Sequence, residues 1–281
     1  MKVRQSILVT GAAGYIGRHV VAALLQQGAK VTAIDIVEKE LPGDVDFIRG
    51  DILHDPYILK ALPALDGCVH LAWQDGFRHH ANSHLQNLYA HYKFLMALAE
   101  LKIKRLTVMG SMHEVGYWEG PVTEDTPCSP LSNYGIAKNS LRQALFVALK
   151  DSSTILQWLR GFYIYGDDWS NHSIFTKLLE ADRNGQTRFP FTSGKNKYDF
   201  ITVNKLADMV AKVALQDKTF GIINICSGTP LSLSEAVESF IKNNHLDIKL
   251  EYGAFPDRPY DSPGIWGDAT KINKIMATTN F

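Results

Sequence analysis

A tyrosine and a lysine at i and i+4 spacing, Tyr134 and Lys138, are the residues of this chain that point most directly to chemistry. On a helix this spacing places both side chains on one face, so the ammonium can stabilise a phenolate that is otherwise scarce near neutral pH. Tyr134 is therefore a candidate general acid or base. Ser111 lies upstream of the pair, and a glycine-rich turn opens the chain. Together these features predict a redox enzyme.

The first apolar run, "SILVT", leads into a glycine-rich turn and then into a segment with helical apolar spacing. This order of strand, turn and helix is typical of a dinucleotide-binding unit. Gly11 would allow the turn, Gly14 would let the backbone approach a pyrophosphate, and Gly17 would let helix and strand pack closely. The GxxGxxG spacing differs from the common GxGxxG pattern and resembles the variant of short-chain dehydrogenases/reductases.

The next expected strand, "AKVTAIDI", places Asp35 near its end. A carboxylate at this point can accept hydrogen bonds from the ribose hydroxyls of a cofactor and repels a 2′-phosphate. We therefore expect NAD as the cofactor rather than NADP. The adjacent His79 and His80 have no third ligand at suitable spacing, so no metal site is expected.

Charge and cysteine content narrow the class of partner. Lys and Arg total 29 residues, and Asp and Glu also total 29, so the net charge is zero. We find no basic run of the kind that binds nucleic acid or an anionic membrane, and no apolar stretch of about eighteen residues that could span a bilayer. The three cysteines lack metal-ligand or redox spacing, which fits a reducing compartment. We therefore expect a cytoplasmic enzyme with a small-molecule substrate.

Strand-like and helix-like segments alternate along the chain, which predicts an α/β fold with a doubly wound, Rossmann-type parallel sheet. Residues 1–165 are expected to form the NAD-binding domain that carries the serine, tyrosine and lysine. Residues 166–281 are expected to form mainly a smaller substrate-binding lobe, with some segments returning to the sheet. Helical segments at 84–101 and 134–150 carry apolar residues on more than one face, which predicts a homodimer through a four-helix bundle.

Taken together, the motifs resemble an extended short-chain dehydrogenase/reductase of the NAD-dependent epimerase/dehydratase group over nearly the whole chain. The resemblance rests on "TGAAGYIG", Asp35, "GDI", "VHLA", Asn87, Ser111, "YGIAK", "LRGFYIYG", "YDFITV" and "RPYDSP…GDATKI". It implies a nucleotide-sugar substrate, tightly held NAD and hydride transfer at a sugar carbon. It also implies that Tyr134 is the acid/base, that Ser111 hydrogen-bonds the same substrate oxygen, and that Lys138 lowers the tyrosine pKa and binds the nicotinamide ribose.

The same resemblance implies a set of cofactor contacts. Asp51 would hold the adenine amino group, the backbone at Leu71 and Ala72 would pass beside the cofactor, and Asn87 would support the active-site helix. The full expected set is Gly11, Gly14, Tyr15, Ile16, Gly17, Asp35, Asp51, Ile52, Leu71, Ala72, Asn87, Tyr134 and Lys138.

The sequence departs from the family pattern at two places expected to face the substrate. After Ser111 it reads "MHEVGYW", which resembles the "SNHTIGYY"-type segment of uronate dehydrogenases, and His113 stands where sugar-nucleotide dehydratases carry an aspartate. Tyr198 stands where many members have an arginine for the substrate diphosphate, although Arg258 matches a second such arginine. The expected substrate contacts are Met112, His113, Glu114, Asn171 and Arg258.

The leading functional hypothesis is an NAD-dependent enzyme that transfers hydride at C4 of a nucleotide sugar, as a UDP-sugar 4-epimerase does. One alternative is an NAD(P)-dependent sugar dehydrogenase or a nucleotide-sugar 4-ketoreductase. An alternative of another class is an NAD(H)-binding regulatory protein without turnover. The epimerase can be distinguished from the dehydrogenase or ketoreductase by absorbance at about 340 nm. An epimerase causes no net change there, whereas a dehydrogenase or a ketoreductase does.

Overall fold

The computed structural model describes residues 4–39, 41–55, 57–166, 173–257 and 261–278. Its centre is a seven-stranded sheet in the order β11-β7-β5-β4-β1-β2-β3, with every neighbouring pair parallel. The strands are β1 (Ser6–Thr10), β2 (Lys30–Asp35), β3 (Asp46–Arg49), β4 (Gly67–His70), β5 (Arg105–Ser111), β7 (Ile155–Gly161) and β11 (Gly221–Ile225). This confirms the predicted doubly wound α/β fold.

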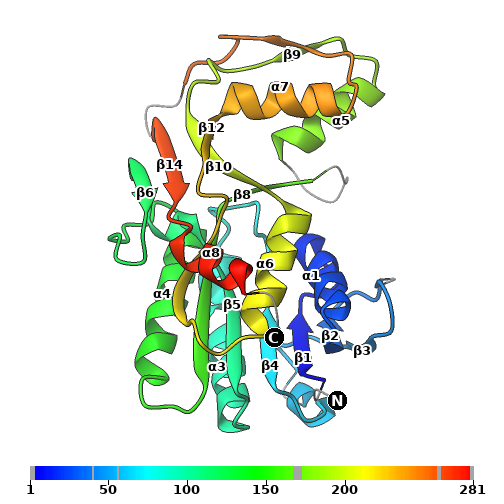
Figure 1. Ribbon diagram of the computed structural model, residues 1–281, viewed down its shortest axis with the longest axis vertical. Helices are drawn as coiled ribbons and strands as arrows, with labels where there is room; N and C mark the ends of the chain where they lie inside the picture. The colour runs from blue at the N-terminus through cyan, green and yellow to red at the C-terminus, as the bar shows by residue number, and fades with distance from the viewer. Residues whose placement is uncertain (1–3, 40, 56, 167–172, 258–260, 279–281) are drawn as a thin grey trace.

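Helices cover both faces of the sheet, so the larger part of the molecule has three layers (Figure 1). On one face α1 (Tyr15–Gln26), α6 (Val203–Ala214) and α8 (Thr270–Ala277) share an apolar core with the sheet. On the other face α3 (Leu88–Glu100) and α4 (Asn133–Ala148) form a second core. Strand residues alternate between the two cores because successive side chains point to opposite faces. Ile7 and Val9 join the first core, for example, and Leu8 the second.

The smaller lobe is built mainly from the second half of the chain. Its mixed sheet has the order β12-β10-β14-β6, and β8 pairs with β10. These strands are β6 (Gly120–Val122), β8 (Tyr163–Tyr165), β10 (Lys197–Thr202), β12 (Pro230–Ser232) and β14 (Gly264–Gly267). The tip of the lobe contains α5 (Ile174–Arg183), α7 (Leu233–Asn243), β9 (Arg188–Pro190) and β13 (Lys249–Glu251), packed around a third apolar core.

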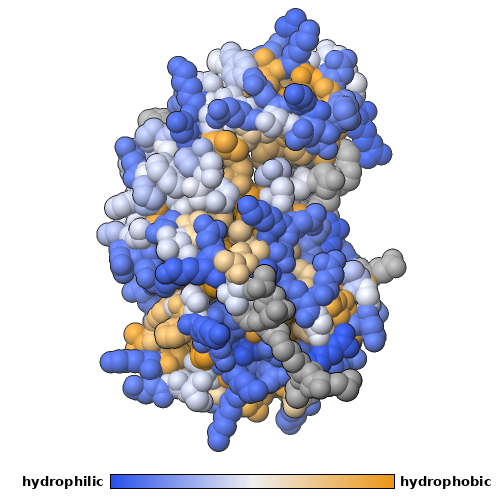
Figure 2. All heavy atoms as spheres, viewed as in Figure 1, coloured by the Kyte–Doolittle hydropathy of each residue, from blue (hydrophilic) through white to orange (hydrophobic). Residues whose placement is uncertain are grey.

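The chain passes repeatedly between the two parts. After β10 in the small lobe it returns as α6 against α1, and β11 then completes the edge of the large sheet beside β7. Figure 2 shows polar side chains over both parts and apolar residues at the waist between them. None of the helices in the described residues is long and apolar enough to cross a membrane.

Three short helical turns complete the described structure: η1 (Ile58–Ala61), α2 (Ser83–Gln86) and η2 (Met112–Glu114). The last two lie beside α4, which places them at the same end of the sheet as Tyr134. The chain order β1–β2–β3 runs outward on one side of β1, whereas β4 and β5 lie on its other side. This reversal beside β1 creates the crevice in which doubly wound sheets bind their ligands.

Candidate active site

The site lies at the carboxyl ends of the central strands. Ser111 is the last residue of β5, and Tyr134 and Lys138 lie in the first turns of α4. The hydroxyl of Ser132 caps this helix by accepting a hydrogen bond from the Gly135 amide. A capped N-terminus fixes the direction in which the first turn points its side chains.

The structure brings the predicted serine, tyrosine and lysine together. The Ser111 side chain hydrogen-bonds Tyr134. The Lys138 ammonium lies 5.8 Å from the centroid of the tyrosine ring and donates a 2.6 Å hydrogen bond to the Met109 carbonyl. Only 3% of Lys138 is exposed. The arrangement can hold a substrate oxygen between a phenol and a hydroxyl with a cation nearby.

Burial dominates the electrostatics of the tyrosine and the lysine. It raises the pKa of Tyr134 to about 12, although the hydrogen bond with Ser111 acts in the opposite direction. It also lowers the pKa of Lys138 to about 7, against the influence of the Glu114 carboxylate. The sequence led us to expect that the lysine would lower the tyrosine pKa. In this arrangement it does not, because the ammonium points to a carbonyl and an indole face rather than to the phenol oxygen.

The glycine turn has the shape that a dinucleotide requires. Gly11 has φ +68°, and a β-carbon there would lie 2.6 Å from the Ala72 amide nitrogen. A β-carbon at Gly17 would lie 2.0 Å from the Gly11 carbonyl oxygen. Gly14 is exposed, and no side chain caps the helix that follows it. The first turn of α1 is therefore open to a pyrophosphate, as its partial positive charge favours.

The expected acidic residues lie at the ends of neighbouring strands. Asp35 ends β2, and its carboxylate accepts hydrogen bonds from the amides of Ala13 at 2.9 Å and Val37 at 3.2 Å. A carboxylate offers about four acceptor positions, so Asp35 retains positions for ribose hydroxyls. Asp51 follows β3 and accepts a hydrogen bond from the Leu53 amide. The residues present therefore fit NAD.

The remaining expected cofactor residues lie along the same edge. Tyr15 and Ile16 are half-buried at the start of α1, and Ile52 is buried beside Asp51. Leu71 and Ala72 directly follow β4, and the Leu71 amide donates to the Thr10 carbonyl at the end of β1. Asn87 lies between α2 and α3, where its side-chain amide donates to Gln74.

Aromatic rings surround Tyr134, which the sequence only partly suggested. His79 stacks on the tyrosine ring at 5.2 Å, and Trp73 meets it edge-on at 6.1 Å. The rings of His84 and His113 lie 5.3 and 6.0 Å away. The loop that carries His79 is fixed to α4, because the Tyr134 amide donates to the His79 carbonyl at 2.9 Å.

Two of the expected substrate residues lie in η2 beside Ser111. Met112 is buried, whereas His113 is partly exposed and its ring lies 4.3 Å from that of His79. Burial lowers the pKa of His113 to about 4, so its imidazole is neutral near pH 7. A neutral imidazole can donate a hydrogen bond through one ring nitrogen and accept one through the other.

Glu114 corrects one sequence-based expectation. Its side chain is fully buried and contacts protein rather than the crevice. The carboxylate accepts hydrogen bonds from the Ser111 amide at 2.7 Å and from the Trp158 indole at 2.9 Å. It also pairs with Arg142 at 3.2 Å and with Arg160 at 3.6 Å. Glu114 therefore holds the backbone of Ser111 in place from behind instead of binding substrate.

Two further expected substrate contacts, Asn171 and Arg258, lie outside the described residues. Tyr198 is described: it is buried in β10, with its ring 4.4 Å from that of Tyr163. At this position the structure has an aromatic pair, so Tyr198 supplies no cation for a substrate phosphate.

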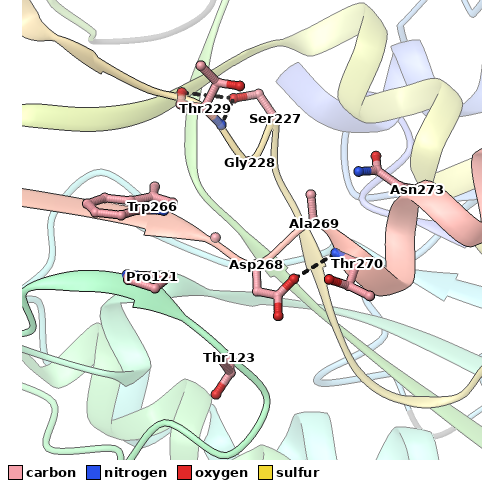
Figure 3. A pocket seen from close by; sticks show the side chains of 11 residues that line it. Pro121, Thr123, Ser227, Gly228, Thr229, Trp266, Asp268, Ala269, Thr270 and Asn273 are labelled. Carbon is pink, nitrogen blue, oxygen red and sulfur yellow. Dashed lines mark hydrogen bonds between the residues drawn. The ribbon is translucent and has the colours of Figure 1, made fainter.

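A hollow of about 460 Å³ lies elsewhere, between β6, the turn after β11 and the start of α8 (Figure 3). Trp266 and Pro121 face it from one side and Asn273 from another. Ser111, Tyr134 and Lys138 do not line it. These three residues therefore lie apart from this hollow, beside the aromatic rings described above.

Some contributors to the site had no recognisable signal in the sequence. One is His84 on α2, which accepts a hydrogen bond from the Trp73 indole. The others are Arg142 on α4 and Arg160 on β7, which both pair with Glu114. Only the spatial proximity of these elements reveals their roles. Among the described residues there is no group of three or more His, Cys, Asp or Glu side chains arranged to hold a metal ion.

Comparisons with known proteins agree with this geometry. Residues 7–226 match the model of the NAD dependent epimerase/dehydratase family. The chain is 46% identical over 269 residues to dTDP-6-deoxy-L-talose 4-dehydrogenase (NAD(+)) of Aggregatibacter actinomycetemcomitans, covering 93% of this chain and 99% of that protein. It is 26% identical to UDP-arabinose 4-epimerase 1 of Arabidopsis thaliana, covering 97% of this chain and 75% of that protein.

Solved structures show the same fold. The UDP-N-acetylglucosamine 4-epimerase from Methanobrevibacter ruminantium M1 superposes with a TM-score of 0.84 at 24% identity, covering 99% of this chain and 93% of that chain. MoeE5 in complex with UDP-glucose and NAD gives a TM-score of 0.80 at 26% identity, with coverage of 98% and 93%. The chain thus belongs to the NAD dependent epimerase/dehydratase family and is an NAD-dependent enzyme.

Proposed function

We propose that this protein oxidises the C4 hydroxyl of a nucleotide-linked 6-deoxyhexose to a ketone, or reduces the ketone in the reverse direction. The observation that carries the reaction class is the assembly of Ser111, Tyr134 and Lys138 at the strand ends beside the glycine turn. A phenol, a hydroxyl and a buried ammonium around one point are the groups needed to move a proton on and off a sugar oxygen.

The proton and the hydride leave the substrate separately. In the oxidative direction Tyr134 takes the proton from the C4 hydroxyl, and Ser111 holds the same oxygen by a hydrogen bond. The C4 hydrogen departs with its electron pair, and the C–O bond becomes a carbonyl. When bound, NAD supplies the acceptor for that hydride, or its donor in the reverse direction. With substrate and cofactor bound, Lys138 would turn its positive charge towards the phenol oxygen and so stabilise the ionised tyrosine.

Overall similarity favours a net dehydrogenase or reductase over an epimerase. The 46% identical relative is named as a 4-dehydrogenase of a dTDP-linked 6-deoxy sugar, and the match spans almost the whole of both chains. We therefore propose a dTDP-6-deoxyhexose as the substrate. The 4-epimerases are more distant, at 26% identity for the Arabidopsis protein. Epimerisation remains the second candidate because it uses the same hydride transfer at C4.

The test is an assay with dTDP-6-deoxy-L-talose and NAD, followed by absorbance at about 340 nm. Net dehydrogenation gives a rise in absorbance and a 4-keto sugar. An epimerase gives no net rise, but a C4-inverted sugar that proton NMR detects in a parallel incubation with UDP-arabinose. Tyr134→Phe should remove either activity while retaining NADH binding. If the wild-type protein binds NADH but turns over neither sugar, the regulatory alternative replaces this proposal.

We also propose which side chains contact the sugar. His113 is partly exposed beside Tyr134 and neutral near pH 7, so it can donate to or accept from a sugar hydroxyl. Met112 adjoins it, and Asn171 and Arg258 are proposed from the sequence alone. His113→Ala should raise the KM for the nucleotide sugar more than tenfold while the Kd for NADH stays within about twofold, if the histidine contributes one buried hydrogen bond. An unchanged KM would remove His113 from the set of contacts.

A homodimer through α3 and α4 is proposed as the assembly. The two helices pack side by side, and their outer faces expose Tyr89 at 71%, Ile136 at 40% and Val147 at 79%. A second copy related by a two-fold axis would cover these residues with the same helices. Light scattering should show a dimer at micromolar concentration, and Val147→Glu should yield a folded monomer. A wild-type monomer would contradict the proposal.

The cytoplasm is proposed as the location of the protein. Cys68, Cys128 and Cys226 are all free thiols in the structure, and two of them are buried. Free thiols persist in a reducing compartment. Fractionation of cells that make the protein with an epitope tag should place it with cytoplasmic markers, and recovery with secreted or envelope proteins would contradict this assignment.

A further inference from the structure

The ammonium of Lys138 lies over the ring of a tryptophan. Its ammonium lies 3.6 Å from the centroid of a Trp73 ring, closer than to the Tyr134 ring at 5.8 Å. It donates a hydrogen bond to the Met109 carbonyl. A carbonyl and an indole face are thus the direct contacts of the ammonium of a lysine that is almost fully buried.

The indole is locked in its orientation by two histidines. Its N–H donates to Nδ1 of His84 at 3.0 Å, and the Nε2 of His84 lies 3.0 Å from the Arg78 carbonyl. Because Nδ1 accepts, the imidazole proton must be on Nε2, where it donates to that carbonyl. His91 stacks on the indole with ring centroids 4.4 Å apart and planes 14° apart.

The contacts of His91 continue into strands β4 and β1. His91 Nδ1 lies 3.0 Å from His70 Nε2, and His70 Nδ1 lies 2.9 Å from the Thr10 hydroxyl. Thr10 ends β1, immediately before the glycine turn, and His70 ends β4. One continuous chain of contacts therefore connects the glycine turn to the surface on which the lysine rests.

We infer that Trp73 is a positioning residue for catalysis, whose indole face holds the Lys138 ammonium beside Tyr134 and favours its charged form. The inference deepens the proposed function, on which it rests for its catalytic meaning. A cation over a tryptophan face gains most when the pair is shielded from water. Here Lys138 is almost fully buried and Trp73 is half-buried. The charge retained in this way is available to stabilise the ionised tyrosine once substrate and cofactor are bound.

The other titratable groups around Lys138 do not take over the role of the indole in favouring the charged form of the lysine. On β4 and α3, burial lowers the pKa values of His70 and His91, so both are neutral near pH 7. On η2, the Glu114 carboxylate raises the lysine pKa, but Arg142 and Arg160 pair with it. Tyr134, on the helix of the lysine itself, is protonated near pH 7 because burial raises its pKa. Trp73 is the direct contact whose removal changes the environment of the ammonium without adding or removing a charge.

The first test measures the titration of Lys138 by NMR, without any substrate. In protein labelled with ¹³C at lysine Cε, the Lys138 signal is identified by its loss in Lys138→Met. Its titration is followed in the wild type, Trp73→Phe and Trp73→Leu. We expect the midpoint to fall by about one pH unit in Trp73→Leu and by less in Trp73→Phe, because phenylalanine retains a weaker π face. His84→Ala should also lower the titration midpoint of Lys138.

The second test separates positioning from simple packing. For both Trp73 variants, the melting temperature and the Kd for NADH are measured beside kcat and KM. Positioning predicts a roughly tenfold lower kcat in Trp73→Leu, with partial recovery in Trp73→Phe and a KM within about twofold. An unshifted lysine midpoint, or equal losses in both variants, overturns the inference. A shifted midpoint in a protein that turns over no nucleotide sugar supports the inference and rejects the proposed function.

If Trp73→Leu does not fold, Trp73→Phe and His84→Ala decide the matter. His84→Ala removes the acceptor of the indole N–H but leaves the indole in place. A lower lysine midpoint in both variants supports the inference, and wild-type midpoints in both overturn it.

Discussion

At the scale of single residues, the protonation of Tyr134 determines how the rate depends on pH in each direction. Burial raises its pKa to about 12, so the phenol is almost fully protonated near pH 7. Reduction of a ketone uses the protonated form, which is abundant. Oxidation of an alcohol uses the ionised form. Below the pKa, the population of that form rises about tenfold for each unit by which the pH increases.

We therefore expect kcat/KM for oxidation to rise with pH between about 6 and 9, by up to roughly tenfold per unit, while reduction stays nearly flat. Initial rates in both directions across this range provide the measurement. The Ser111→Ala variant should oxidise more slowly at every pH in this range with the same slope, because the lost hydrogen bond from Ser111 lowers the tyrosine pKa. An oxidation rate independent of pH would show that Tyr134 is already ionised near neutrality.

Glu114 gives a second residue-scale prediction, on stability. Glu114→Gln would remove the negative charge that pairs with Arg142 and Arg160, and Arg160 is fully buried. Breaking a buried ion pair by removing one partner costs about 3–5 kcal/mol. Urea unfolding should show a loss of this size, and Glu38→Gln at an exposed position serves as the control. Equal urea-unfolding midpoints for Glu114→Gln and Glu38→Gln would contradict a stabilising role for the ion pairs of Glu114.

These residues also show how much of the site the sequence could predict. Tyr134 and Lys138 were predictable because i and i+4 spacing alone places them on one face of a helix. Glu114 was expected to contact the substrate because the segment after Ser111 was expected to face it, but the side chain is buried against Trp158 and Arg160 on β7. No local pattern encodes that contact, since it depends on the pairing of β5 with β7.

At the scale of elements, the junction between the glycine turn and α1 allows little space. A β-carbon at Gly17 would lie 2.0 Å from the Gly11 carbonyl oxygen, and backbone cannot move aside as a flexible side chain can. Gly17→Ala should weaken NADH binding at least tenfold and destabilise the fold by about 1–3 kcal/mol. Gly76→Ala is the matched control, because its β-carbon would meet nothing within 4 Å. Isothermal calorimetry and thermal unfolding measure the two effects.

The buried histidines that join β1, β4 and α3 predict sensitivity to acid. Burial lowers the pKa of His70 from its ordinary 6.5 to about 3. Below pH 6.5 the unfolded chain binds a proton that the folded chain does not, so stability falls as the pH decreases towards 3. At about pH 5 the loss from His70 alone is roughly 2 kcal/mol.

The measurement is urea unfolding at pH 7 and at pH 5 for the wild type, His70→Asn and His80→Gln. His70→Asn should be less stable at pH 7 because it disturbs the bonds to Thr10 and His91, yet it should lose less stability between the two pH values. His80 is exposed, so its replacement should leave the pH dependence unchanged. Identical slopes in all three proteins would exclude His70 as the cause.

The order of elements was largely predictable and their mutual contacts were not. Apolar runs such as "SILVT" and the glycine turn identified β1 and α1, because buried parallel strands and tight turns have strong local signals. The placement of β11 beside β7, and of α6 against α1, could be expected only in outline. Contacts of this kind join residues far apart in the chain and leave no periodic pattern.

At the scale of the whole molecule, cofactor binding should stabilise the fold and discriminate between NAD and NADP. A ligand at about one hundred times its Kd adds roughly 2.7 kcal/mol of stability, which corresponds to several degrees in melting temperature. We expect this shift with NAD and a much smaller one with NADP, because the Asp35 carboxylate repels a 2′-phosphate. Asp35→Asn should narrow the difference between the two cofactors. Equal shifts in the wild type would contradict the assignment of NAD.

The interleaving of the two parts determines when the protein can fold during synthesis. While the first half emerges from the ribosome, β7 remains an open edge and the face of the sheet beside α1 lacks α6. An unpaired strand edge and a bare apolar face invite association with other chains. The nascent first half therefore keeps both surfaces exposed until residues 203–225 supply α6 and β11. A gene cut after residue 165 would encode an aggregating fragment rather than a working dinucleotide-binding domain.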